Sequence, residues 1–235
     1  MRSNPHLADP RWSLAEDVAA AVCRRYPRDT HAVGVHGSLA HGDGADGGEL
    51  DVRVVTVDAG AGPRPARRRI GGVIVDLDVV WRDEYLRHAR KLDTSWPLSA
   101  DNFLTTKAVY DPDGWHDKLR DTHLGRLAEA RDLEFAGLAR EAWCHAQSMF
   151  RDAIRLAEWH DTAGALLALG EARLSAALVE GLLSRTYFRG GADAVSRTGL
   201  GEADLPEVGR RLAAQAETLD RRGHPVDGTI ADLLA

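Results

Sequence analysis

The sequence predicts an α+β protein, with strands and a first helix in the N-terminal part and helices in the C-terminal half. Valine-rich runs recur between residues 31 and 81, which is typical of strands. From about Asp83 onward the apolar period changes from two to nearly four, which indicates helices. A chain of 235 residues that is 44% hydrophobic can bury one large core or two small ones. We expect two domains, 1–120 and 121–235.

The first predicted element is a helix over residues 13–26. Its apolar side chains recur at helical spacing, Ser13 stands at the N-cap position, and Glu16 follows three residues later, as in a capping box. Pro27 cannot continue a helix, so we expect the helix to end there.

Three strands are predicted next, over residues 31–37, 49–57 and 72–81. A glycine-rich loop joins the first two, and valines, isoleucine and leucine surround two aspartates in the third. The segment 59–69 contains two prolines and ends in Arg67, Arg68 and Arg69, so we expect an irregular, exposed loop. The three arginines could meet a phosphate, although such a run is more often a solvated flank.

The C-terminal half is predicted to be helical. Within it, the segment 165–183 is apolar on most sides, which is typical of a buried central helix or an interface helix. The helices are expected over residues 83–92, 113–119, 124–160, 163–187 and 207–219.

Composition excludes several classes of protein. Thirty basic and thirty-six acidic side chains give a net charge of −6, which argues against a nucleic-acid partner and permits a cationic one. No run of 18 apolar residues and no signal-peptide pattern is present, so we expect neither a membrane protein nor an exported one. The two cysteines cannot form a disulfide framework, and their scarcity favours a cytoplasmic location.

Four carboxylates stand at alternate positions of two predicted strands. Glu49 and Asp51 open the second strand, and Asp76 and Asp78 lie in the third. Residues two apart on a strand point the same way, so each pair faces one side of the sheet. Carboxylates this close repel each other unless a cation neutralises them, and hard oxygen ligands favour Mg²⁺. Each pair taken alone is more often a solvated face.

A Gly37-Ser38 turn ends the first predicted strand, shortly before the carboxylates. Its backbone N–H groups and hydroxyl could cradle the phosphates that a magnesium ion would hold. Alone it would be a plain turn, but with the acidic pairs it indicates metal-assisted nucleotidyl transfer. No GxxxxGK[ST] loop is present, which excludes a P-loop enzyme.

The Gly-Ser turn and the acidic pairs resemble a known sequence signature. The run VGVHGSLAHGDGADGGELDVRVV resembles the nucleotidyltransferase superfamily signature, a Gly-Ser followed by an acidic-x-acidic strand. The segments VDLDVVWRDEYL, SWPLSADNF, VYDPDGW, EADLP and RRGHPVD are similar to those of the kanamycin nucleotidyltransferase family, the aminoglycoside 4'-O-nucleotidyltransferases. The similarity covers residues 31–227, nearly the whole chain.

The resemblance implies a mixed sheet flanked by helices in an N-terminal catalytic domain, and a C-terminal helical bundle domain that contributes the substrate cleft and a homodimer interface. It implies ATP, or another nucleoside triphosphate, as co-substrate and Mg²⁺ as cofactor. Gly37 and Ser38 would contact the triphosphate, and Mg²⁺ would be held by Glu49, Asp51 and Asp76. Whether Asp78 joins them stays open.

The chain departs from the family at four positions. The acidic pair is Glu then Asp instead of Asp then Glu, and counting from Tyr110 places His145 where the family has its glutamate base. Glu141, one turn earlier on the same face, is the alternative base. Met149 stands in place of a family lysine, and His41 is the candidate to replace that positive charge at the phosphates.

The expected function is transfer of AMP from Mg-ATP to the 4'-hydroxyl of a kanamycin-type aminoglycoside, which would confer antibiotic resistance. The alternatives are another small hydroxyl acceptor, such as a lincosamide, and a nucleotide-binding regulator without catalysis. A polycationic drug would require an acidic cleft, which the net charge permits.

Overall fold

The structure is a computed structural model that describes residues 9–43 and 48–234. Part of the predicted glycine-rich loop, residues 44–47, therefore lies outside the described residues. The chain divides into two compact units, which we call the sheet unit (Met1–Lys91 and Asp101–Ala128) and the helical unit (Leu92–Ala100 and Glu129–Ala235). A single division at residue 120 would fall within helix α5 (Trp115–Glu129).

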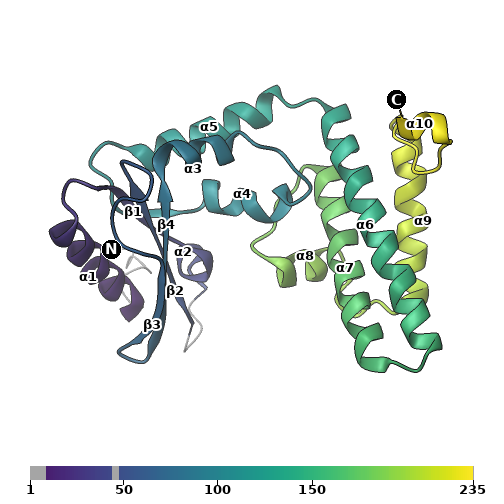
Figure 1. Ribbon diagram of the computed structural model, residues 1–235, viewed down its shortest axis with the longest axis horizontal. Coiled ribbons are helices and arrows are strands. Elements are labelled where there is room, and N and C mark those ends of the chain that lie inside the picture. The colour runs from purple at the N-terminus through teal and green to yellow at the C-terminus, as the bar shows by residue number, and fades with distance from the viewer. Residues whose placement is uncertain (1–8, 44–47, 235) are drawn as a thin grey trace, which may run out of the picture. The chain divides into compact units, whose positions relative to one another are not determined.

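The sheet unit contains a five-stranded mixed sheet, as the predicted α+β class requires. The strand order is β3-β4-β2-β1-β5, in which β2 and β4 are parallel and the other pairs are antiparallel (Figure 1). The strands are β1 (Thr30–His36), β2 (Leu50–Thr56), β3 (Ala66–Ile70), β4 (Val73–Trp81) and β5 (Lys107–Tyr110).

Helix α1 (Pro10–Arg25) covers one face of this sheet. It begins earlier than the predicted Ser13, because the Asp9 side chain accepts a hydrogen bond from the Arg11 backbone N–H and Pro10 occupies the first turn. Its apolar stripe packs against alternate residues of β1 and β2. The buried residues of this core are Ala15, Ala19, Val22, Val33, Val35, Leu39, Leu50, Val52, Val54 and Val75.

Elements of the sheet unit cover one end of the other face of the sheet. There α3 (Arg82–Ala89), the end of α4 (Trp96–Leu104) and α5 bury a second apolar cluster against β1 and β2. Its members are Ala32, Val55, Tyr85, Ala89, Phe103, Trp115 and Leu119. Toward the start of β2 and the end of β1 the same face becomes polar, and the candidate site lies there.

Two sequence predictions are wrong in detail. The loop expected over 59–69 contains strand β3, whose five residues are all exposed, so no buried alternation marked it. Its arginines are typical of a sheet edge protected by charge. The single helix expected over 124–160 is two helices, because α5 ends at Glu129 and α6 begins at Asp132.

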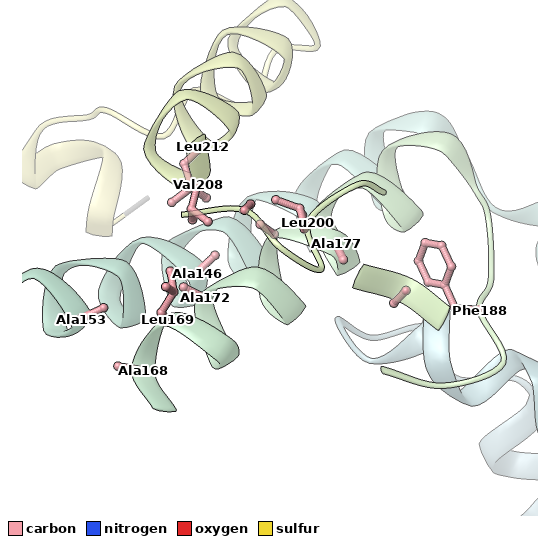
Figure 2. Packing of buried hydrophobic residues seen from close by; sticks show 13 residues of the cluster. Ala146, Ala153, Ala168, Leu169, Ala172, Ala177, Phe188, Leu200, Val208 and Leu212 are labelled. Atoms are coloured by element: carbon pink, nitrogen blue, oxygen red, sulfur yellow. The ribbon is translucent and has the colours of Figure 1, made fainter. Parts of the chain in front are cut away.

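The helical unit is built around α6 (Asp132–Glu158) and α7 (Thr162–Ser184), which pack along their lengths. Alanines such as Ala146, Ala153 and Ala172 fill the interface, and such small side chains let helix backbones approach closely (Figure 2). α8 (Gly191–Arg197) and α9 (Leu205–Arg221) complete this core, and α10 (Ile230–Leu234) follows. None of the helices in the described part of the chain could cross a membrane.

Candidate functional site

The strand register places charged side chains in two rows across the polar face of the sheet. Asp51 of β2 is paired with His36 of β1 on one side and with Asp76 of β4 on the other, and Asp76 is paired with Arg67 of β3. Residues directly opposite each other project from the same face, so these four form one row. Two residues further along, Gly34, Arg53 and Asp78 form the second row.

Three carboxylates gather in and beside the first row, and we call Glu49, Asp51 and Asp76 the acidic cluster. Glu49 directly precedes β2, two residues before Asp51. The pKa of Asp51 is raised from its ordinary value, first by burial and then by the charges of Glu49 and Asp76. Within the sheet unit, Glu49 and Asp76 therefore lie near enough to Asp51 for their charges to act on it.

The Gly37-Ser38 segment lies against this cluster. Gly37 has φ of +69°, which favours glycine, and a Cβ at this position would collide with the Asp51 carboxylate. It opens α2 (Gly37–His41), a short helix where the sequence predicted a turn, and Ser38 is exposed directly after it. Glycine thus permits the end of β1 and the Asp51 carboxylate to touch.

His36, the last residue of β1, contributes a neutral ring to the same row. Burial lowers its pKa to about 4, and the positive charge of Arg53 acts in the same direction. The imidazole is therefore uncharged at neutral pH and adds no cation beside Asp51.

The second row contains an ion pair between Arg53, whose side chain is 13% exposed, and Asp78, whose side chain is 48% exposed. The Arg53 guanidinium contacts Asp78 Oδ2 at 2.9 Å from Nε and 2.8 Å from Nη2, and its Nη1 donates to the Tyr85 hydroxyl at 2.5 Å. Tyr85 in turn donates to the Asn102 carbonyl at 3.3 Å. Arg53 thus engages Asp78, which leaves Asp76 as the aspartate of β4 in the acidic cluster.

Arg67 carries a positive charge to the acidic cluster. It forms an ion pair with Glu49 and lies 3.9 Å from Asp76 Oδ2. Over residues 9–43 and 48–234, no three His, Cys, Asp or Glu side chains are arranged to hold a metal ion. The oxygen donors nevertheless suit a hard divalent cation, because half-buried Asp51 lies near the charges of two further carboxylates, Glu49 and Asp76. In the arrangement shown, the guanidinium takes part of that neutralising role.

His41, predicted to lie at the phosphates, contacts a different group. Its Nε2 is 3.0 Å from Asp101 Oδ2, and the two side chains are 11% and 5% exposed. The other oxygen of Asp101 is buried without a hydrogen-bond partner. The pair therefore connects the end of α2 to α4, and a role of His41 in binding phosphate stays a prediction.

The two candidate bases belong to the helical unit. His145 and Glu141 are both exposed and lie one turn apart on α6, whereas Ala142 and Ala146 of the same helix are buried. Met149, the residue in place of the family lysine, is partly buried against the helical core. The structure therefore leaves both candidate side chains open to solvent.

Three residues of the site were missed or undervalued at the sequence level. Arg53 follows Asp51 at the strand period, so pairing the alternations of β2 and β4 would have placed it beside Asp78. Arg67 was recognised only as part of a basic run, because its partners depend on the unpredicted strand β3. Asp101 gave no local signal, since its contact with His41 spans 60 residues.

Comparison with known proteins adds a limited finding. No family model and no curated protein matches the chain. Among solved structures, the chain is similar to a nucleotidyltransferase-like protein from Exiguobacterium sibiricum, with 14% identity and a TM-score of 0.46. The similarity covers 88% of this chain and 75% of the other. The functional argument therefore depends on the site itself.

Asp51→Asn should stabilise the protein at neutral pH. Because the folded-state pKa of Asp51 is raised above 3.8, its ionisation disfavours the folded state, and the asparagine removes that penalty. The variant's gain in the free energy of unfolding should appear as pH rises above about 3.8, and it should vanish in more acidic solution. Urea denaturation at several pH values measures it, with exposed Asp121→Asn as the control. A loss of stability at pH 7 would contradict this interpretation of Asp51.

His36→Gln should flatten the acid side of the stability profile. The folded-state pKa is depressed, so unfolding takes up a proton, and stability falls as pH drops from about 6.5 to about 4. The variant should remove up to about 3 kcal/mol of this pH dependence. Urea denaturation between pH 7 and 4 tests it against exposed His88→Gln. If the free energy of unfolding changes with pH by the same amount in both variants, the proposed contribution of His36 is excluded.

Proposed function

We propose that the protein is a nucleotidyltransferase that transfers AMP from Mg-ATP to a hydroxyl group of a small molecule. The observation that supports this most is the pairing of Asp51 with Asp76 on adjacent strands, with Glu49 beside them and Gly37 in contact with Asp51. The carboxylates support nucleotidyl transfer because they could hold a divalent cation, which would neutralise negative charge where the polyphosphate binds.

In this proposal Glu49, Asp51 and Asp76 hold the divalent cation. When bound, Mg²⁺ would stabilise the charge that develops on the phosphate oxygens. The chain itself would supply the exposed Ser38 and the backbone after Gly37 as contacts for the triphosphate. Asp78 would take no part, because Arg53 engages it.

The acceptor oxygen would attack the α-phosphorus in line with the leaving group. A new P–O bond forms to the acceptor, the bond from the α-phosphorus to the bridging oxygen breaks, and pyrophosphate leaves with the electron pair. The hydroxyl proton would pass to an imidazole nitrogen of His145, or to the Glu141 carboxylate, both of which are exposed. A general base of this kind typically accelerates a reaction by about 10²–10⁴-fold.

For the acceptor we propose a kanamycin-type aminoglycoside modified at its 4'-hydroxyl, and hence a role in antibiotic resistance. The support is the resemblance of the sequence segments to that family, together with a net charge of −6 that suits a polycation. A cytoplasmic homodimer is part of the same proposal. A lincosamide acceptor, or a nucleotide-binding regulator without catalysis, is the alternative, the latter because His145 and Met149 replace the family residues.

The direct test incubates the protein with Mg-ATP and a panel of aminoglycosides and lincosamides. We expect an adenylylated aminoglycoside by mass spectrometry and release of pyrophosphate. Asp51→Asn should lower the rate at least about 100-fold because it removes a cation ligand, whereas Asp121→Asn should not. If only a lincosamide gives a product, the proposed acceptor is a lincosamide instead of an aminoglycoside. If the protein binds Mg-ATP but no acceptor gives a product, the regulator without catalysis is favoured.

Single replacements identify the base. If His145 accepts the proton, His145→Ala should lower kcat by about 10²–10⁴-fold. Exposed Glu158→Ala, further along α6, provides the control. A comparable loss in Glu141→Ala alone would assign the base to Glu141, and full activity in both variants would exclude them.

A further inference from the structure

Arg67 is placed differently from Arg68, the residue that follows it. In register it lies opposite Asp76, whereas Arg68 lies opposite Val75 and therefore projects from the other face of the sheet. Arg67 forms the ion pair with Glu49 and approaches Asp76, and the Arg68 guanidinium donates to the Arg67 carbonyl at 2.8 Å. These two neighbouring arginines thus have different electrostatic environments.

Its charge acts on all three members of the acidic cluster. Besides the ion pair with Glu49 and the 3.9 Å approach to Asp76, the positive charge of Arg67 opposes the rise in the pKa of Asp51. The guanidinium therefore lies where it offsets the mutual repulsion of the carboxylates. A divalent cation bound by the same oxygens would do the same with twice the charge.

We propose that Arg67 is a built-in counter-ion of the acidic cluster, which competes with a divalent cation for the carboxylates of Glu49 and Asp76 and thereby sets the affinity of the cluster for that cation. The inference rests on the proposed function, which assigns a cation to these carboxylates. Before a cation binds, the chain itself places a positive charge beside these carboxylates.

The contacts are of a kind that a cation can displace. The Arg67 side chain is 55% exposed, and those of Glu49 and Asp76 are each 43% exposed, so the ion pairs gain little from burial. β3 is an edge strand, and the side chain can turn into solvent without disturbing the pairing of β3 with β4. Displacement therefore requires a side-chain rotation and leaves the sheet intact.

The test is the affinity of the full chain, without nucleotide, for Mn²⁺, measured from the free-ion signal by electron paramagnetic resonance. Arg67→Gln should bind Mn²⁺ about three- to tenfold more tightly than the unaltered protein, because the competing charge is gone. Arg68→Gln, which removes the same charge from the opposite face, should change the affinity less than twofold. Circular dichroism checks that each variant is folded.

A second variant locates the effect. Adding Asp51→Asn to Arg67→Gln should abolish the gain in affinity, because the tighter binding requires the acidic cluster. Equal or weaker Mn²⁺ binding in Arg67→Gln, or an equal gain in Arg68→Gln, overturns the counter-ion role and leaves the proposed function standing. Absence of Mn²⁺ binding in every variant overturns both, because the carboxylates would then hold no cation.

Discussion

The parallel pairing of β2 with β4 is the constraint on which the site depends. It places Asp51 opposite Asp76 and Arg53 opposite Asp78. A slip of one residue would turn Asp51 toward α1 and expose Val52, because side chains alternate between the two faces. Burial of Leu50, Val52 and Val54 against α1 opposes such a slip. The apolar side of the sheet therefore determines the position of the carboxylates on its polar side.

The same pairing gives Asp76 and Asp78, the two aspartates of β4, different surroundings. Asp78 belongs to a partly buried network with Arg53 and Tyr85, which joins the sheet to α3. Asp76, two residues earlier, is half-buried and lies 3.9 Å from Arg67 Nη1. The two carboxylates differ because Asp78 is paired with the buried Arg53 of β2, whereas Asp76 lies opposite the exposed Arg67 of the edge strand β3.

The sequence predicted those features that depend on alternation within a strand. The strands around residues 49–57 and 72–81, and the shared face of Glu49 with Asp51 and of Asp76 with Asp78, followed from a period of two. The position of Asp76 beside Asp51 depends on the pairing of β2 with β4. Strand β3 could not be predicted, because all five of its residues are exposed and it depends on pairing with β4. The contact of His41 with Asp101 joins residues 60 positions apart, so no local sequence pattern predicted it.

The electrostatics of the polar face favour a binding role over a purely structural one. Folding half-buries Asp51 among like charges and buries His36 as a neutral ring, and both pKa shifts record interactions that disfavour the charged form in the folded state. A face selected only for stability would replace them with apolar or paired side chains. Arg67 offsets the acidic charge from the rim, through exposed contacts that contribute little stability. A weakly compensated group of carboxylates next to a glycine turn is what a site for a cation and its phosphates requires.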